Sequence, residues 1–323
     1  MSSNEIQENK QRVWEFWQAL NQSGADGVAD VVRSYVHEVI SWHGPHPIND
    51  LEGVEALVTG FWEPLLRAFP DLQRTVEIFI GGHRHWVGAV GYFSGTFAED
   101  WLGIPATGGE ITIRFGEMSA VYGGKVGLTY IIPDVLDVIR QAGYQVVAPS
   151  LGREGMVTGP MTGDGVLMTP QDDAEGAKTL ALAKTMCGEL NTPRCEPYWD
   201  VDGMRWYGPS GIGTSVGYKE FEEFHQNRFD EVFPSYGCQF AGQHVAEVGE
   251  GNYAGWVGWP SIRTYHSGEY LGVPPTGKLV EWRLMDFYRR EGDLIVENWV
   301  PVDMAHLFRT MGVDIFEELK RQI

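Results

Sequence analysis

The sequence has neither long apolar runs nor paired cysteines. A membrane-spanning helix needs about 18 consecutive apolar residues, and no such run is present. The three cysteines form no CxxC pair, which argues against a disulfide framework or a zinc ribbon and favours a reducing compartment. The first residues, MSSNEIQENK, lack a basic stretch followed by an apolar one, so no secretion signal is visible. We expect a cytoplasmic protein without a membrane partner.

Positive charge is also scarce. The chain has 24 lysines and arginines against 44 aspartates and glutamates, which gives a formal net charge of −20 at pH 7. Such a surface repels polyanions, so we expect no nucleic-acid partner.

Several motifs that carry a known mechanism are missing. The sequence has no P-loop, no Gly-x-Gly-x-x-Gly between a strand and a helix, and no Gly-x-Ser-x-Gly elbow. His43 and His46 flank a Gly-Pro pair, and His83 and His85 are spaced to share a strand face. No further carboxylate or histidine spacing completes a set of three or four ligands. We therefore expect no metal and no cofactor.

The chain does contain an internal duplication. WHGPHPINDLEG (42–53) matches WYGPSGIGTSVG (206–217), and YFSGTFAEDWLGIPATGG (92–109) matches YHSGEYLGVPPTGK (265–278). The last pair aligns Phe93 with His266 if the first copy has four extra residues. Matches in the same order over this length indicate a repeated domain rather than a short solenoid repeat.

Between the copies lies a segment rich in Gly, Pro, Thr and Met, residues 149–170. It predicts a linker between a first domain at 1–148 and a second domain at 171–323. Apolar residues at helical spacing predict a helix over 4–21, and the Glu-Gly-Asp within 279–300 predicts a hairpin. Helices placed before a run of antiparallel strands indicate the α+β class.

The Gly-Pro, Phe-Pro, SGEYLGVPPTGK, GDLIVENW and MGVD segments together resemble the SnoaL-like polyketide cyclase family. This resemblance covers nearly the whole chain twice. It implies a nuclear-transport-factor-2-like fold, in which a curved, mostly antiparallel sheet wraps on helices around a conical pocket. We expect two tandem cone-shaped α+β barrels that pack through their open sheet faces as an internal pseudo-dimer. A homodimer of the tandem chain is a further possibility that the resemblance leaves open.

The resemblance also implies a mechanism without metal or cofactor, in which a late aspartate removes an acidic carbon-bound proton. Its usual context is Glu-His-Trp-Asp, which matches Glu297, Asn298, Trp299 and Val300 here, with Ile132 taken as the first-half counterpart of Val300. Neither position carries a carboxylate. The base must therefore be supplied from elsewhere if the chain is an enzyme.

Asp134 and Asp303 occur in both copies and are the first alternative. Each is either a replacement base or the N-cap of the apolar helical pattern that follows it. The second pair is Arg114 and Arg283, in the first strand of each hairpin. A buried arginine at this place binds either an oxyanion of the ligand or a neighbouring carboxylate such as Asp286.

His266 is the histidine that lies within a family motif. As a neutral imidazole it is suited to proton transfer near pH 7, although a single histidine in a strand also occurs as a structural group. Phe93 cannot transfer protons, so a catalytic His266 would make the halves unequal.

These observations give two hypotheses. The first is a cofactor-independent acid/base enzyme that cyclises, isomerises or hydrolyses a small, fairly apolar, polyketide-like carbonyl compound, with His266, Arg283 and Asp303 as catalytic residues. The second is a non-catalytic binding or scaffold protein that has lost the cyclase carboxylate. The residues that we expect to line a ligand pocket are Trp42, His43, Arg114, Trp206, Tyr207, Met285, Asn298 and Val300.

Overall fold

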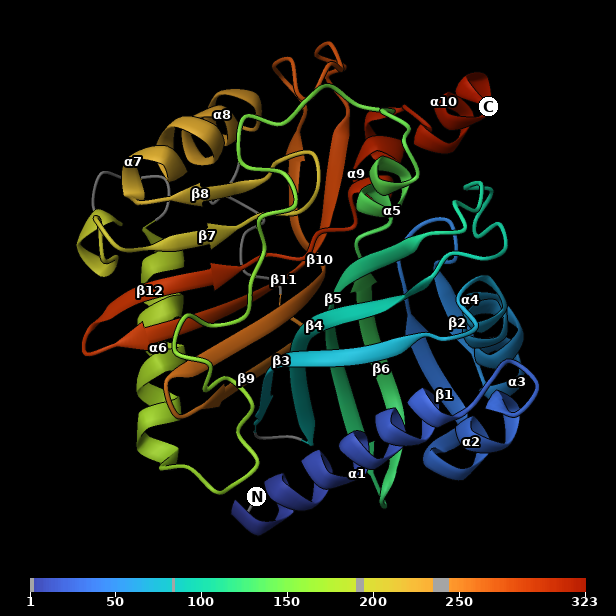
Figure 1. Cartoon of the computed structure of the whole chain (residues 1–323). Coiled ribbons are helices and arrows are strands. Elements are labelled where there is room, and N and C mark those ends of the chain that lie inside the picture. Colours follow the sequence, from blue (N-terminus) through green and yellow to red (C-terminus); the bar gives the residue numbers. More distant parts are fainter. Residues whose placement is uncertain (1–2, 83–84, 190–194, 235–243) are drawn as a thin grey trace.

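The two halves of the chain form two open, six-stranded sheets (Figure 1). The structure, a computed structural model, describes residues 3–82, 85–189, 195–234 and 244–323. The first sheet has the order β2-β1-β6-β5-β4-β3, with β1 Val36–His43, β2 Asp50–Glu52, β3 Gln73–Gly81, β4 Trp86–Thr96, β5 Glu110–Tyr122 and β6 Lys125–Pro133. The second has the matching order β8-β7-β12-β11-β10-β9, with β7 Arg205–Tyr207, β8 Thr214–Val216, β9 Ala246–Glu250, β10 Tyr253–Tyr265, β11 Leu279–Glu291 and β12 Leu294–Trp299.

Helices cover the outer side of each sheet. The first domain has α1 Ser3–Gln22, α2 Val28–Tyr35, α3 Val54–Leu57, the π-helical turn η1 Val58–Trp62, α4 Glu63–Ala68 and α5 Val135–Gln141. The second has α6 Asp173–Gly188, η2 Glu196–Tyr198, α7 Tyr218–Phe221, the π-helical turn η3 Glu222–Gln226, α8 Asn227–Val232, α9 Met304–Met311 and α10 Ile315–Gln322. The two tandem α+β domains are thus confirmed. The expected barrels are corrected, because neither sheet closes among the described strands.

Each sheet is mixed rather than fully antiparallel. β1 pairs with β6 and β7 pairs with β12 in parallel, whereas the remaining pairs are antiparallel. The predicted hairpin between β11 and β12 is present, and its turn contains Gly292 at φ 58. Glycine adopts this left-handed backbone conformation without steric cost, which explains why it marks the turn in the sequence.

The inner faces of the two sheets pack against each other. Side chains alternate along β11, so Met285 and Phe287 share one face of the strand while Leu284 and Asp286 share the other. The first face joins a buried cluster with residues of both sheets: Ile78, Ile80, Trp86, Val90, Met118, Ala120, Tyr130, Ile132, Tyr207, Ala246, Val248, Tyr253, Val257, Met285, Phe287 and Trp299. The predicted pseudo-dimer is therefore formed through the sheet faces.

A reciprocal pair of polar contacts also joins the domains. Asp134 caps α5 by accepting from the Asp137 N–H at 3.1 Å, and its other oxygen accepts from the Ser210 N–H at 2.9 Å and from Arg114 at 3.1 Å. Arg114 in turn donates to the Gly208 carbonyl at 2.7 Å. One carboxylate therefore holds its own helix and the Gly-Pro loop of the opposite domain.

The second domain repeats this arrangement in the other direction. Asp303 caps α9 by accepting from the His306 N–H, and its other oxygen accepts from the His46 N–H of the first domain, both at 3.0 Å. Arg283 lies 3.7 Å from the same oxygen. Such a mutual exchange of equivalent contacts is the geometry of an isologous dimer interface, here within one chain. We refer to the two sets as the Asp134 clamp and the Asp303 clamp.

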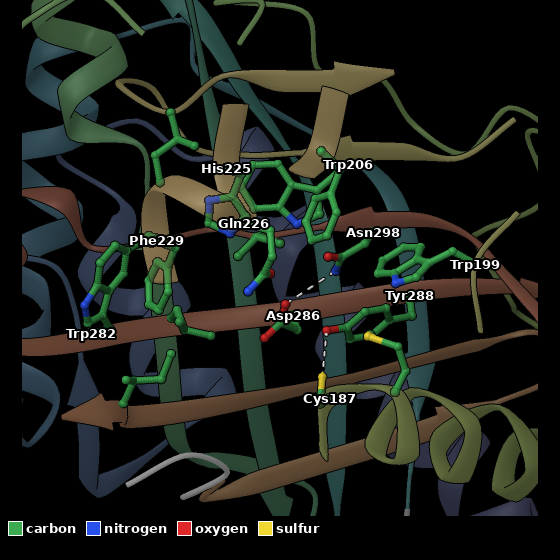
Figure 2. A pocket seen from close by; sticks show the side chains of 17 residues that line it. Cys187, Trp199, Trp206, His225, Gln226, Phe229, Trp282, Asp286, Tyr288 and Asn298 are labelled. Carbon is green, nitrogen blue, oxygen red and sulfur yellow. Dashed lines mark hydrogen bonds between the residues drawn. The ribbon is translucent and has the colours of Figure 1, made fainter. Parts of the chain in front are cut away.

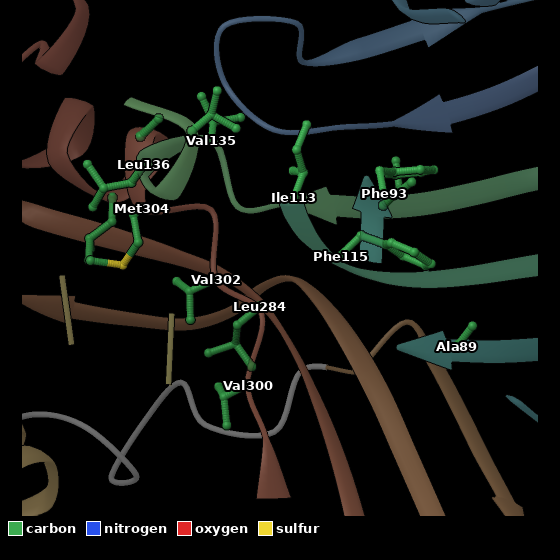
Figure 3. Close-up of a cluster of buried hydrophobic side chains, with 14 of the residues drawn as sticks. Ala89, Phe93, Ile113, Phe115, Val135, Leu136, Leu284, Val300, Val302 and Met304 are labelled. Atoms are coloured by element: carbon green, nitrogen blue, oxygen red, sulfur yellow. The ribbon is translucent and has the colours of Figure 1, made fainter. Parts of the chain in front are cut away.

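The hydrophobic core is continuous beside these clamps (Figure 3). Leu136 of α5 and Met304 of α9 approach the same glycine, Gly211, where a Cβ atom would lie 3.1 and 3.6 Å from them. The segment that we expect to link the domains, residues 149–170, reinforces this contact. The Thr158 carbonyl accepts from the Trp299 indole at 2.7 Å, and Val166 forms an isolated parallel bridge with Phe79, whose N–H donates to the Gly165 carbonyl at 2.8 Å.

Strand register corrects the alignment of Phe93 with His266. Phe93 pairs with Ile113, the residue before Arg114, whereas Ile262 pairs with Trp282, the residue before Arg283. Phe93 is thus equivalent to Ile262.

The counterpart of His266 is Phe97. Each exchanges backbone hydrogen bonds with the glycine of the Thr-Gly pair and the residue after it: Phe97 with Gly108 and Gly109, His266 with Gly277 and Lys278. The four-residue gap in the sequence alignment was therefore wrong. Identical residue types in two segments do not show which strand residues pair with each other.

Register also shifts the first-half counterpart of Val300 by one residue. Trp42 pairs with Thr129 in the first sheet, and the equivalent Trp206 pairs with Asn298 in the second. Counting on from these pairs, Val300 corresponds to Ile131. Ile132 instead faces the opposite sheet.

We predict that the Asp134 clamp contributes far more stability than an ordinary helix cap. Asp134→Ala leaves the buried Arg114 without its carboxylate and should lower the free energy of unfolding by about 3–5 kcal/mol. The matched control is Asp172→Ala, which removes an exposed cap of α6 and should cost about 1 kcal/mol. Urea unfolding of both variants measures the difference, and equal losses would contradict a role beyond capping.

We also predict that the second domain, expressed without the first, does not remain a soluble monomer. Residues 171–323 expressed alone would expose Met285, Phe287 and Trp299, which the first sheet now covers. An exposed apolar face of this kind favours self-association. Size-exclusion chromatography with light scattering should show dimers or larger particles, whereas a stable monomer would be inconsistent with an obligate interface.

Candidate functional site

The second domain contains a cavity between its sheet and its helices (Figure 2). Its volume is about 70 Å³. The walls come from α6, the run of α7, the π-helical turn η3 and α8, and strands β7, β10, β11 and β12 with the segment after β12. The lining residues are Met186, Cys187, Trp199, Trp206, Ile212, Phe221, His225, Gln226, Phe229, Ile262, Trp282, Leu284, Asp286, Tyr288, Asn298, Val300 and Val302. Most of them are apolar or aromatic, which suits an apolar ligand with a few polar groups.

The turn η3 brings two polar side chains to the cavity. His225 and Gln226 are its last residues, where the first domain has Phe61 and Trp62 at the end of η1. The His225 ring stacks on Trp206 with centroids 4.0 Å apart and planes 19° apart. Burial lowers the pKa of His225 to about 3, because desolvation disfavours the imidazolium. His225 is therefore a neutral imidazole at physiological pH.

Asp286 of β11 is the carboxylate of the cavity. It lies between Met285, whose N–H donates to the Pro301 carbonyl, and Phe287, which pairs with Trp299. Asp286 must therefore face Val300 directly across the two strands. This places a carboxylate beside the position where the family resemblance implies the base, but on the neighbouring strand.

Hydrogen bonds orient the Asp286 carboxylate. Trp256 donates its indole N–H at 3.0 Å, and the Asn298 amide lies 3.4 Å from the other oxygen. Burial nevertheless raises the pKa of Asp286 to about 6, against the lowering effect of the hydrogen bonds from Asn298, Tyr288 and Trp256. A carboxylate with such a pKa is mostly ionised at pH 7 and is a stronger base than an exposed aspartate.

Cys187 of α6 and Tyr288 of β11 line the cavity beside Asp286. The thiol and the hydroxyl lie 3.4 Å apart. Burial raises the pKa of Cys187, so its sulfur stays protonated and is a poor nucleophile. No lysine or arginine is among the described lining residues. The site therefore suits a neutral ligand better than an anionic one.

Three of the residues expected to bind a ligand line this cavity: Trp206, Asn298 and Val300. The other second-domain candidates, Tyr207 and Met285, lie on the opposite face of the sheet, within the interface between domains. Tyr207 stacks on Trp299 there, with ring centroids 5.2 Å apart.

The three residues expected to be catalytic do not meet at the cavity. Arg283 lies on the interface side of β11, over the Trp259 ring at 4.8 Å, and Asp303 belongs to its clamp. Burial raises the pKa of Asp303 to about 6, against the lowering effect of the two N–H bonds and Arg283. Both oxygens of Asp303 are thus engaged by protein groups.

His266 is fully buried beside the ring of Phe233, with centroids 5.8 Å apart. Its Nδ1 lies 3.0 Å from the Thr276 hydroxyl, and burial lowers its pKa. These contacts place it in the apolar core near the strand connection and outside the described cavity lining.

The first-domain candidates lie in three different places. Trp42 packs on Phe61 in the first core, with ring centroids 4.6 Å apart. His43 stacks on Tyr130 at 4.4 Å, and Arg114 belongs to the Asp134 clamp. None of the three lines the cavity of the second domain.

Sequence reasoning missed His225 and Gln226, and it assigned Asp286 only to an ion pair. A signal for the first two was present. Residues 67–72 match residues 231–236 around a Phe-Pro pair. Extended towards the N-terminus without a gap, this match aligns Phe61 with His225 and Trp62 with Gln226. A histidine and a glutamine in place of two core aromatics mark a change in the interior of the domain.

Among the described residues, no three His, Cys, Asp or Glu side chains gather as metal ligands. His83, one of the histidines considered for a metal, lies outside the described residues, as does Cys238. The described helices include none that is both long enough and apolar enough to span a membrane.

Solved structures from three bacteria resemble parts of this chain. A protein from Jannaschia sp. CCS1, described as a SnoaL-like polyketide cyclase, is 22% identical and covers 43% of this chain and 93% of its own, with a TM-score of 0.38. IdmH from Streptomyces antibioticus is 20% identical and covers 42% of this chain and 99% of its own, with a TM-score of 0.37. TsrD from Streptomyces laurentii is 21% identical and covers 44% of this chain and 98% of its own, with a TM-score of 0.36. No curated protein matches the chain.

The family model for the SnoaL-like polyketide cyclases matches the chain twice, over residues 11–142 and again over residues 192–311. Together these segments cover most of the sequence and contain all the strands of both sheets. The chain belongs to the SnoaL-like polyketide cyclase family.

Proposed function

We propose that the second domain binds a small, largely apolar carbonyl compound and catalyses proton transfer on it, as in cyclisation or isomerisation. The observation that carries this proposal is Asp286, a carboxylate with a raised pKa that lines an apolar cavity beside Val300. Family membership supports a small-molecule substrate. We place the base on β11, where it takes over the role that the family resemblance gives to the Val300 position.

In this mechanism the Asp286 carboxylate removes a proton from the carbon next to the substrate carbonyl. The carbon–hydrogen bond breaks, its electron pair moves onto the carbonyl oxygen, and the proton resides on Asp286 until a new bond to carbon or oxygen forms. A base with a pKa near 6 is closer to the pKa of such a proton than an ordinary aspartate is. The oriented carboxylate also avoids reorganisation during the step.

Neutral donors stabilise the enolate oxygen. His225 carries an N–H even in its neutral form, and the amide of Gln226 offers a second donor on the same turn. Because burial keeps His225 neutral, it polarises the carbonyl without losing a proton in the ground state. The aromatic walls, including Trp206 and Trp282, exclude water and strengthen these interactions.

A second candidate function is binding without turnover. It is favoured by the valine at position 300 and by the small cavity volume, about 70 Å³, whereas pockets for drug-sized ligands measure roughly 300–1,000 Å³. On this reading Asp286 accepts a hydrogen bond from the ligand and transfers no proton.

We predict that Asp286→Asn abolishes proton exchange on a ketone probe. With 2-tetralone in deuterated buffer, nuclear magnetic resonance measures loss of the proton next to the carbonyl, and the rate should fall by about 10²–10⁴. In the wild type, kcat/KM should rise through pH 6 to a plateau, because the base must be ionised.

The matched control is Asp293→Asn, the same substitution at an exposed residue of the β11–β12 turn, which should retain the wild-type rate. His266→Gln tests the competing assignment. Loss of exchange in His266→Gln but not in Asp286→Asn would refute the role of Asp286, and wild-type binding of the ketone with no exchange above buffer would leave only the binding function.

We further predict that Asp286 destabilises the fold at neutral pH. Its folded pKa, about 6, exceeds the unfolded value of about 3.9, so its contribution to stability is full below pH 3.9 and is lost as pH rises through 6. Relative to wild type, Asp286→Asn should therefore gain about 2 kcal/mol of unfolding free energy between pH 4.5 and pH 7.5. Urea unfolding at both values measures this, and a difference independent of pH would argue against the raised pKa.

A further inference from the structure

The first domain fills the space that is a cavity in the second domain. Arg74 of β3 extends its guanidinium into the interior, where the carbon of that group lies 4.4 Å from the ring centre of Trp17 and 4.7 Å from those of Phe93 and Phe115. The Trp62 ring lies at 5.9 Å. Figure 3 shows Phe93 and Phe115 on neighbouring strands. These four rings form a cage around a planar cation.

A carboxylate completes the cage. Arg74 Nη1 lies 2.7 Å from Glu117 Oε2, and the two side chains are only 2% and 5% exposed. Ser119 donates to the other Glu117 oxygen at 2.8 Å. Burial lowers the pKa of Arg74, and Glu117 opposes that effect. Arg74 Nη2 has no hydrogen-bond partner among the described residues, so the aromatic faces are its main contact.

Register shows that this cage and the cavity are the same place in the two domains. Glu117 pairs with Ile131, as Asp286 faces Val300. Phe115 follows Arg114 in the first hairpin as Leu284 follows Arg283 in the second. The equivalent interior is therefore occupied in one domain and hollow in the other.

The backbone at Arg74 is held independently of its guanidinium. The Asn21 side chain accepts from the Arg74 N–H at 2.9 Å and donates to its carbonyl at 3.3 Å. Asn21 lies in α1, which also carries Trp17. Shortening the Arg74 side chain therefore removes the occupant of the cage while the strand and helix that form its walls stay linked.

We propose that the first domain contains a binding site for a planar cation of the guanidinium class, and that the chain itself occupies this site with Arg74. The consequence is that the interior of the first domain that corresponds to the cavity is not open to the small-molecule ligand of the second domain. This proposal stands independently of the reaction assigned to Asp286, since it concerns the other domain.

Chemical rescue tests the proposal. Arg74→Ala keeps Cβ and removes a fragment with the shape of N-ethylguanidinium, so this compound at millimolar concentration should raise the Tm of the variant saturably. N-ethylurea has nearly the same shape without the charge and should need at least tenfold higher concentrations for the same shift. Wild-type protein, whose cage is full, should show no saturable shift with either compound.

The double variant Arg74→Ala/Glu117→Gln locates the bound cation. It should lose at least tenfold in its preference for N-ethylguanidinium, because the carboxylate that pairs with the cation is gone. If Arg74→Ala alone is recovered unfolded, refolding in N-ethylguanidinium, but not in N-ethylurea, should restore the near-ultraviolet circular dichroism of the wild type. Equal responses to both compounds, no response to either, or a preference that survives Glu117→Gln would overturn the proposal.

Discussion

The clamps of Asp134 and Asp303 determine how the two sheets meet. A buried carboxylate is costly unless its oxygens are hydrogen-bonded, and in each clamp one oxygen caps a helix while the other binds a loop of the opposite domain. The end of each sheet, the helix after it and the opposite Gly-Pro loop are thereby joined. Because the domains arose by duplication, the two sets have the reciprocity of a symmetric dimer, with the linker as a covalent addition.

This packing decides what β11 contributes to the candidate site. A strand places successive side chains on opposite faces, and the sheet interface takes the face that carries Arg283, Met285 and Phe287. The remaining face, with Leu284 and Asp286, lines the cavity. Asp286 faces Val300, the residue that follows β12, so its carboxylate lies beside that position in the cavity.

The two domains show two uses of one interior. In the first, Phe61 and Trp62 end the π-helical turn, and the Arg74–Glu117 pair fills the remaining space. In the second, His225 and Gln226 end the equivalent turn and the space is hollow. The surrounding strand orders are the same, so the difference lies in side chains rather than in topology. A duplicated domain can thus serve as a stable half of an interface while its copy retains a cavity.

Motifs and periodicities along the sequence were sufficient to predict the duplication and the fold class. The duplication and the α+β class follow from repeated motifs and from periodicities of 2 and 3.6 residues, which are local properties of the chain. Both Asp134 and Asp303 are helix caps, one of the two roles that their positions before apolar helical patterns allow. The alignment of His266 with Phe93 was wrong because similar residues aligned across a gap do not determine strand register. The backbone hydrogen bonds of β10 and β11 do determine it.

The sequence did not determine which face of each strand packs against the opposite sheet. Both faces of β11 carry apolar as well as charged residues, so alternation shows that Arg283 and Asp286 point in opposite directions but not which one meets the partner sheet. That choice depends on the packing of residues far apart in the chain, such as Met118 and Phe287, which both lie against Gly88. The amino-acid order alone therefore established the repeat, the class and the family likeness, and only the docking of the two sheets decided that Asp286, not Arg283, reaches the cavity.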